Sequence, residues 1–215
     1  MKEIFCVGDW GDVVDDENAQ FFKKKKNYEF YLLGDNFYPE GVVGLNDSQW
    51  KTKFKKLFPK ISTKYCCLGN HDYLGDTFSQ IKMTFTSDNG NWNLPYFYHD
   101  IFDQQNSVHT FFIDTQILAK DITIFLSKSC GISDDKLQEY LSLVYQLKER
   151  QLVWLENKLA TSSAKWKIIC GHYPVISNGP HQISSELQED ILPLIDRYNV
   201  DIYVSSKSEL KVFIV

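Results

Sequence analysis

Four short apolar segments of the sequence are each followed by a glycine and then by a side chain that can bind a metal ion. These junctions are Val7-Gly8-Asp9, Leu33-Gly34-Asp35, Leu68-Gly69-Asn70 and Cys170-Gly171-His172. Tyr38, three residues after Asp35, adds a phenol. Carboxylate, phenol, amide and imidazole groups together favour iron, manganese or zinc over calcium. The phenol further favours a ferric ion, because a trivalent cation can hold a tyrosine side chain deprotonated near neutral pH.

Each junction has an ordinary structural explanation when it is taken alone. Gly-Asp after a strand is typical of a turn, Gly-His of a loop histidine, and a single tyrosine such as Tyr38 of packing. Their occurrence together, each directly after an apolar segment, favours one shared site. A carboxylate in such a site can also bridge two metal ions roughly 3.5–4 Å apart. The pattern therefore predicts a metal centre rather than a set of unrelated turns.

The elements that must bring these junctions together are short strands that alternate with helices. The apolar segments are rich in β-branched or aromatic residues, which suits strands buried on both faces. They are Ile4–Val7, Phe30–Leu33, Tyr65–Leu68, Val108–Ile113, Lys167–Cys170 and Asp201–Val204. Helical spacing of apolar residues occurs over Ser48–Phe58, Glu149–Leu159 and Ser184–Tyr198. The alternation predicts a layered α/β fold, in which ligands bind beyond the carboxyl ends of the strands.

The composition is that of a globular protein and excludes several other classes. The 215 residues carry 23 basic and 28 acidic side chains, a formal net charge of −5, and 15% of them are aromatic. The aromatic residues supply surface to bury, which excludes a disordered chain. The lack of a basic excess argues against nucleic acid as a partner. No apolar run approaches the roughly 18–20 residues that span a bilayer, so we expect no membrane partner. No linker or repeat divides the sequence, so we expect a single domain over residues 1–215.

The cysteines and the first residues bear on the cellular compartment. The five cysteines include the adjacent pair Cys66 and Cys67, and we expect buried free thiols rather than a disulfide framework. The chain starts directly in a predicted strand and shows no secretory signal. The sequence as written therefore predicts a cytoplasmic protein, although Asn46-Asp47-Ser48 would be a glycosylation sequon in a secreted one.

Longer motifs around the junctions resemble those of a known enzyme family. They are Val7-Gly8-Asp9-Trp10-Gly11, Leu33-Gly34-Asp35-Asn36-Phe37-Tyr38, Gly69-Asn70-His71-Asp72 and Gly171-His172-Tyr173-Pro174-Val175. From residue 3 to about residue 204 the chain resembles the calcineurin-like metallophosphoesterases, and specifically the tartrate-resistant (type 5) purple acid phosphatases. The resemblance implies an α/β fold in which a two-sheet sandwich is flanked by helices. It also implies a secreted or lysosomal location as the alternative to a cytoplasmic one.

The resemblance further implies a centre of two metal ions, Fe(III) paired with Fe(II), Zn(II) or Mn(II). Matched residue by residue, Asp9 and Tyr38 would bind the ferric ion, and Asp35 would bridge the two ions. Asn70 and His172 would bind the divalent ion.

Two histidines would take part in catalysis without binding metal. His71 would contact the substrate phosphate and help to protonate the leaving oxygen, with Asp72 orienting its ring. His181, nine residues after His172, would also face the substrate.

The implied reaction is the hydrolysis of phosphomonoesters at acidic pH, with a small phosphomonoester or a phosphoprotein as substrate. One alternative is the hydrolysis of phosphodiesters or nucleotides by the same kind of centre. The other is a non-catalytic binding or scaffold protein of the same fold. The oligomeric state is left open by the sequence.

The sequence departs from the family pattern after the strand predicted at Asp201–Val204. The family continues there with Gly-His-x-His, whose two histidines bind one metal ion each, whereas this chain has Ser206-Lys207-Ser208-Glu209. Each metal ion would keep three protein ligands, counting Asp35 twice, and would lose one imidazole, which weakens its binding. Glu209 could bind a metal ion, but Lys207 could not while it is protonated.

Residues 205–215 therefore form a divergent tail, and we expect the last strands of the second sheet to be missing. Three explanations compete: a truncated or frame-shifted version of a working phosphatase, a binding protein with a degraded site, and an enzyme with an altered metal set. The first is favoured because all the chemistry up to His181 is intact. Missing strands would expose a sheet edge, and the apolar segment Lys211–Val215 would add to the tendency to associate.

Overall fold

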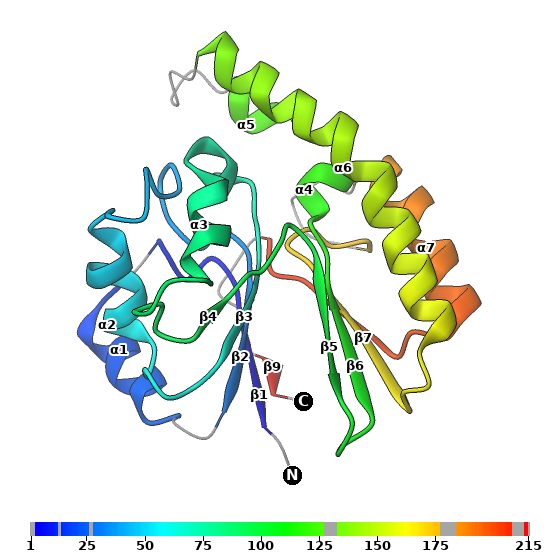
Figure 1. Cartoon of the computed structure of the whole chain (residues 1–215), viewed down its shortest axis with the longest axis horizontal. Coiled ribbons are helices and arrows are strands. Elements are labelled where there is room, and N and C mark those ends of the chain that lie inside the picture. Colours follow the sequence, from blue (N-terminus) through cyan, green and yellow to red (C-terminus); the bar gives the residue numbers. More distant parts are fainter. Residues whose placement is uncertain are drawn as a thin grey trace.

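The computed structural model describes residues 3–12, 14–25, 28–126, 133–176, 184–207 and 213–214, and two β-sheets lie at its centre (Figure 1). The first sheet has five strands in the order β4-β3-β2-β1-β9. They are β1 (Ile4–Val7), β2 (Glu29–Leu33), β3 (Lys64–Cys67), β4 (Trp92–Asn93) and β9 (Phe213–Ile214). The strands β1 to β4 pair in parallel, and β9 pairs antiparallel with β1.

The second sheet has four strands in the order β5-β6-β7-β8. They are β5 (His99–Asp103), β6 (Val108–Phe112), β7 (Trp166–Cys170) and β8 (Ile202–Val204). β5 and β6 form an antiparallel pair, whereas β6, β7 and β8 are parallel. The carboxyl ends of the parallel strands of both sheets lie at the upper end of the sandwich in Figure 1, which places the predicted junctions at one end of the molecule.

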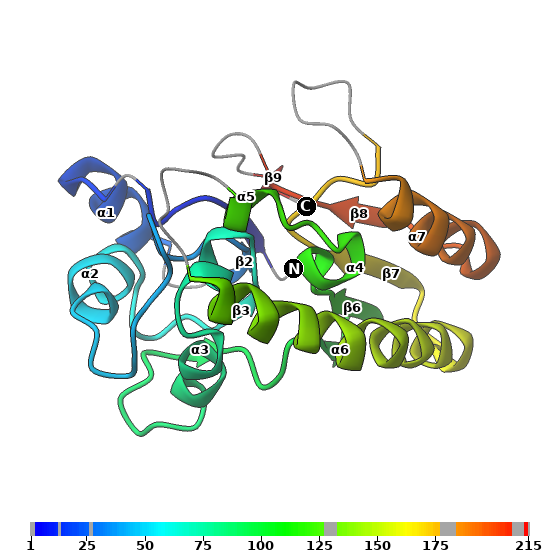
Figure 2. The ribbon, with the colours of Figure 1, turned by 90° about the horizontal axis from the view of Figure 1, so that it is seen from above.

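Helices cover the outer side of each sheet (Figures 1 and 2). On the first sheet lie α1 (Asp16–Lys23), a π-helical turn (Trp50–Phe54) continued by α2 (Lys55–Leu57), and α3 (Thr77–Met83). On the second lie α4 (Thr115–Ala119), α6 (Asp134–Thr161) and α7 (Ser185–Tyr198). A 3₁₀ turn (His71–Leu74) and α5 (Thr123–Leu126) complete the described helices. None of the described helices is long and apolar enough to cross a membrane.

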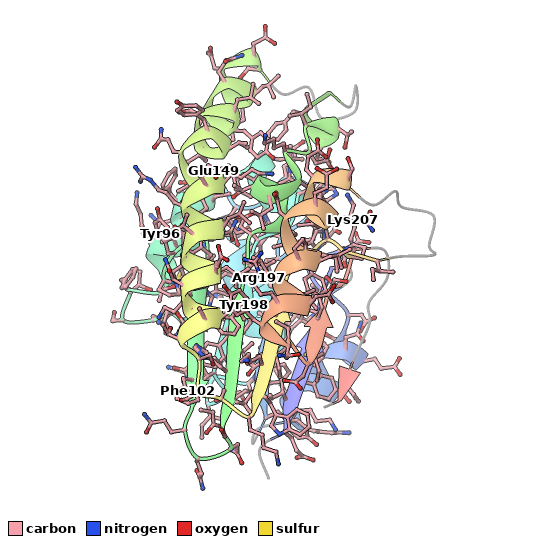
Figure 3. All side chains as sticks on the ribbon, turned by 90° about the vertical axis from the view of Figure 1, so that its right-hand side faces the viewer. Tyr96, Phe102, Glu149, Arg197, Tyr198 and Lys207 are labelled. Carbon is pink, nitrogen blue, oxygen red and sulfur yellow. The ribbon has the colours of Figure 1, made fainter. Side chains whose placement is uncertain are left out.

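Polar contacts join the two long helices over the second sheet. Arg197 and Tyr198 of α7 lie on the side that faces α6 (Figure 3). The Arg197 guanidinium and the Tyr198 hydroxyl both donate to Glu156 of α6, at 2.7 and 3.0 Å. Because the side chains of Arg197 and Glu156 are 62% and 43% exposed, we expect their ion pair to orient the helices more than to stabilise them.

Apolar side chains form three layers, one under the helices of each sheet and one between the sheets. The layer between the sheets contains Tyr31, Phe112 and the thiols of Cys6, Cys67 and Cys170. The four described cysteines are free and buried, which confirms that prediction for them. Burial raises the pKa of the Cys6 thiol to about 12, so it stays protonated and unreactive. The fifth cysteine lies outside the described residues.

The predicted α/β sandwich is confirmed, and every predicted strand and the helical stretches Ser48–Phe58 and Ser184–Tyr198 occur within a few residues of their predicted bounds. The stretch predicted at Glu149–Leu159 is the last part of the longer helix α6, which begins at Asp134. The structure adds β4, β5 and β9. β5 was missed because charged and polar side chains interrupt it, which hides an edge strand from a search for apolar runs. We expected the apolar tail to add to the tendency of the protein to associate. Two of its residues instead form β9, which extends the first sheet beside β1.

His99 of β5 is a titratable side chain buried between apolar neighbours. It is 8% exposed, and its ring stacks on that of Phe112 with centroids 4.7 Å apart. Neither ring nitrogen has a hydrogen-bond partner among the residues that the structure describes. Burial therefore lowers the pKa of His99 to about 3, because the charged form is not stabilised by any neighbour strongly enough to offset its lost hydration.

We predict that His99 destabilises the protein in mild acid. Below pH 6.5 the unfolded chain takes up a proton at His99, whereas the folded chain does not until about pH 3. The free energy of unfolding therefore decreases as the pH is lowered from 6.5 towards 3. Relative to pH 8 this loss is about 2 kcal/mol at pH 5. Urea unfolding at both pH values should show a smaller loss for His99→Phe than for the wild type. Equal losses in the two proteins would contradict the prediction.

Candidate metal centre

The structure brings together the ends of β1, β2, β3 and β7, which come from both sheets. Asp9, Asp35, Asn70 and His172 follow these strands in that order, and the ligand atoms of Asp9, Asp35 and His172 lie within 4.8 Å of one another. The Tyr38 hydroxyl lies 2.8 Å from Oδ1 of Asp9 and 2.7 Å from Oδ2 of Asp35. Oδ1 of Asn70 lies 3.2 Å from Nε2 of His172. The residues predicted to bind metal are therefore neighbours in the fold.

The two carboxylates stand on strained backbone. Asp9 has a φ of 55° and Asp35 a φ of 51°, in the left-handed region that side chains disfavour. The Asp9 N–H donates to the carbonyl of Gly34 at 3.2 Å, which ties the end of β1 to the end of β2. A Cβ on Gly69 would lie 2.3 Å from the backbone nitrogen of Asp35, so only glycine permits this approach. The turns thus hold both carboxylates in one small space.

A buried carboxylate, Asp72, holds the loops that follow β2 and β3 against each other. It accepts hydrogen bonds from the backbone N–H groups of Asn36 and Gly69 at 3.1 and 2.9 Å. It also accepts from the side-chain amides of Asn36 and Gln80. Burial, together with the nearby charge of Asp35, raises the pKa of Asp72 to about 6 in spite of these donors. The carboxylate therefore fixes the distance between two of the loops that carry the site.

The prediction that Asp72 orients His71 is wrong. The acceptor for His71 is the carbonyl of Pro39, 2.6 Å from Nδ1, and the imidazole lies over the Tyr38 ring with centroids 4.3 Å apart. Because a carbonyl only accepts, Nδ1 carries a proton and Nε2 is left for another partner. His71 is thus part of the same strand-end site. His181, the other predicted catalytic histidine, lies outside the described residues.

His172 is oriented by contacts that leave one ring nitrogen facing the carboxylates. Its Nδ1 lies 3.0 Å from the carbonyl of Leu33, which makes Nδ1 the donor, and Nε2 lies 3.4 Å from Oδ2 of Asp35. The hydroxyl of Thr115 accepts its backbone N–H at 3.2 Å. Burial alone would lower the pKa of His172, but the charge of Asp35 and then that of Asp9 outweigh it and raise the pKa. Metal-binding histidines are commonly oriented in this way by a carbonyl.

The site holds more acceptors than the chain's own donors can serve. One phenolic proton on Tyr38 faces both Asp9 and Asp35, and Oδ2 of Asp9 is buried with no hydrogen-bond partner in the described structure. Burial and then the charges of Asp35 and Asp9 raise the pKa of Tyr38. Burial should raise the pKa of Asp35 too, yet the adjacent His172 and His71 hold it at about 2. A cation bound among these oxygens would remove the imbalance, so the residues present fit a metal ion.

Several supporting contacts were not found from the sequence. The indole N–H of Trp10 donates to the side chain of Asn36 at 3.1 Å. The Lys53 ammonium donates to the carbonyls of Gly11 and Tyr38, at 2.7 and 2.8 Å. These groups join loops that are far apart in the chain, and no local pattern marks a lysine as the donor to such carbonyls. Trp10 and Asn36 both lie inside the glycine-containing motifs, which were the available signal for them, whereas Lys53 lies outside every motif.

The divergent tail also reaches the site. The hydroxyl of Ser206 donates to the carbonyl of Leu33 at 2.9 Å. A Cβ on Gly8 would lie 1.8 Å from the Ser206 hydroxyl oxygen. Lys207 follows Ser206 directly, so its backbone stands beside the strand ends. Glu209, which we considered as a ligand, lies outside the described residues.

Comparison with known proteins places this arrangement among phosphoesterases. The model of the calcineurin-like phosphoesterase family matches residues 3–206. Human tartrate-resistant acid phosphatase type 5 is 32% identical over 222 residues, which cover 93% of this chain and 64% of that protein. Purple acid phosphatase 7 of Arabidopsis thaliana is 26% identical, over 94% of this chain and 62% of its own length. The chain thus spans less than two thirds of the length of these relatives.

A solved structure shares the fold. GAP50, described as the anchor in the inner membrane complex of Plasmodium, matches with a TM-score of 0.71 and 22% identity, over 95% of this chain and 65% of that one. At this level of identity the likeness concerns the fold alone.

We predict that Asp72→Asn destabilises the protein by about 1–3 kcal/mol, because the new amide presents a donor where the carboxylate accepted from buried N–H groups. The matched control is Asp76→Asn, four residues away, where the side chain accepts from the first turn of α3. Asparagine serves that position as well as aspartate does, so the control should change little. Urea unfolding measures both variants. A loss no larger for Asp72→Asn than for the control would contradict the role assigned to Asp72.

Proposed function

The chain belongs to the calcineurin-like phosphoesterase family, and from the geometry of its strand-end site we propose that it is a metal-dependent acid phosphatase that hydrolyses phosphomonoesters. The single observation that supports this most strongly is the clustering of Asp9, Asp35 and His172, with ligand atoms within 4.8 Å of one another and a buried carboxylate oxygen without a partner in the described structure. The family is metal-dependent, and its relatives named above are acid phosphatases.

We assign the metal ligands to two overlapping sets. Asp9, Asp35 and Tyr38 offer three oxygens, which suits a ferric ion. Asp35, Asn70 and His172 offer two oxygens and a nitrogen, which suits Fe(II), Zn(II) or Mn(II). Asp35 belongs to both sets, because its Oδ2 lies 2.7 Å from the Tyr38 hydroxyl and 3.4 Å from Nε2 of His172. When bound, the metal ions would neutralise the phosphate and activate the attacking water.

The chain's own residues have distinct parts in this reaction. The strained turns at Asp9 and Asp35 and the carboxylate of Asp72 hold the ligands in place before substrate arrives. His71 holds its ring against Tyr38 and Pro39. In the imidazolium form, with a proton on both ring nitrogens, its Nε2 can donate a proton to the departing oxygen, and the ring is left neutral with its Nδ1 proton in place. The substrate would be a small phosphomonoester or a phosphorylated protein side chain, both of which present a phosphate dianion to a cationic centre.

A binding or scaffold role is the second candidate, and one observation favours it. The tail places Lys207, a cation, next to the strand ends where the family pattern has a histidine. GAP50, which shares this fold, is described as an anchor. A folded chain that binds neither iron nor zinc would support this candidate over the phosphatase. Hydrolysis of a phosphodiester without hydrolysis of a monoester would instead support a diesterase.

We predict that the full chain, loaded with iron and zinc, hydrolyses p-nitrophenyl phosphate and loses this activity after chelation. Asp35→Asn should lower kcat/KM by about 100-fold or more, because it weakens a ligand shared by both metal positions. Asp196→Asn on the exposed side of α7 is the control and should retain the activity. Activity that survives both chelation and Asp35→Asn would rule out a metal-dependent reaction at this site.

We also predict that the effect of His71→Asn depends on the leaving group. If His71 protonates the departing oxygen, the variant should lose about 100-fold in kcat with an alkyl phosphate and much less with p-nitrophenyl phosphate, whose leaving group needs no proton. The nitrophenyl ester therefore serves as the internal control for folding and metal loading. Equal losses with the two substrates would assign His71 to phosphate binding instead.

A further inference from the structure

The segment that follows β8 is fixed to the backbone of His172. The N–H groups of Ser206 and Lys207 both donate to the carbonyl of His172, at 3.1 and 3.0 Å. The Ser206 hydroxyl lies 3.4 Å from Nδ1 of the same histidine and donates to the carbonyl of Leu33. Because these contacts involve backbone groups, they hold the Cα of Lys207 beside His172 whichever side chain stands at position 207.

The Lys207 side chain lies over the residue next to His172. Its ammonium is 3.8 Å from the centroid of the Tyr173 ring and 3.7 Å from Oδ2 of Asp121, and 24% of the side chain is exposed. Figure 3 shows Lys207 close to the upper end of α7, on the side of the molecule where β8 ends. Cation–π and ion-pair contacts of this kind restrict a lysine that would otherwise extend into solvent.

The ammonium also lies within the electrostatic range of the metal-binding carboxylates. Asp121 is its nearest acidic partner, and the charges of Asp35 and Asp9 act on it as well. The ammonium is attracted by the same carboxylates that would bind a metal ion, and its positive charge repels a metal ion bound to them. A protonated lysine has no lone pair to offer the metal in return.

The repulsion is not shared equally between the two ligand sets. Lys207 is anchored on His172 and Tyr173, and Nε2 of His172 faces Asn70 and Asp35. The ammonium lies over the Tyr173 ring, whose centroid is 5.3 Å from that of the His172 ring, so the set formed by Asp35, Asn70 and His172 has the lysine close to one of its ligands. The other set depends on Asp9 and Tyr38, which follow β1 and β2 in the opposite sheet.

We propose that Lys207 is a resident cation of the metal centre that weakens the position formed by Asp35, Asn70 and His172, so that the chain binds one metal ion tightly and a second one only weakly. This inference rests on the proposed function, since it concerns the same ligands. The active form would then depend on the concentration of the weakly bound divalent ion, which makes that ion a regulator of the centre rather than a permanent part of it.

The test is a calorimetric titration of the metal-free full chain with Zn²⁺. Elemental analysis of the protein after gel filtration then gives the number of Zn²⁺ ions that remain bound. The wild type should bind one Zn²⁺ tightly and a second about 100-fold or more weakly. Lys207→His replaces the charge with an imidazole and should bind two with similar affinity. Lys207→Gln, which only removes the charge, should strengthen the second site by about 10-fold.

Two controls separate charge from other effects. Lys207→Arg keeps the positive charge and should behave as the wild type does. Lys158→Gln removes a positive charge from α6, where the side chain pairs with Asp100, and should leave both affinities unchanged. The melting temperature of each variant shows whether it is folded.

Each outcome decides between the inference and the proposed function. Two equally tight Zn²⁺ ions in the wild type would overturn the inference and support a complete centre. One ion in both the wild type and Lys207→His would overturn it as well, while the proposed function would stand. No Zn²⁺ in either protein, with both folded, would overturn the inference and the proposed function together.

Discussion

The central constraint on this structure is that two carboxylates are held side by side at one end of the sandwich, which costs free energy. Asp9 and Asp35 share one phenolic proton from Tyr38, and both sit on left-handed backbone. Like charges at this distance repel, and strained turns add to the cost. Such an arrangement persists only where the surroundings force it and where a cation offsets the charge. The capacity of these residues to hold a metal ion follows from this one constraint.

The rest of the fold supplies the force that holds the carboxylates. Parallel strands of two sheets end at the same height, and their apolar faces are buried both between the sheets and beneath the helices. The loops beyond the strands are then joined by polar contacts that cross between them, above all through Asp72. Glycine at the closest approaches removes the Cβ atoms that would separate the loops. The core stabilises the fold, and the glycines and Asp72 fix the position of each ligand by holding the loops close together.

The tail shows how a local change can alter such a site while the fold is kept. The strand β8 and the backbone contacts after it lie where they support His172. The side chain at position 207, however, brings a fixed positive charge to a centre that is built to attract cations. Relatives with the same framework include acid phosphatases, and a protein described as an anchor shares the fold.

The sequence alone determined the layered α/β class, the strands that carry the site, and which side chains meet at the strand ends, and its resemblance to a known family added the sandwich. Short buried strands, each followed by Gly and a polar residue, are local signals, and parallel strands leave their carboxyl ends no other place to converge. Tertiary structure alone decided that Asp72 binds loop backbone rather than His71, and that Lys53 joins two carbonyls. It alone also placed the charged edge strand β5 and the tail strand β9. These outcomes depend on contacts between residues distant in the chain, and neither residue type nor spacing encodes which of several available partners lies within reach.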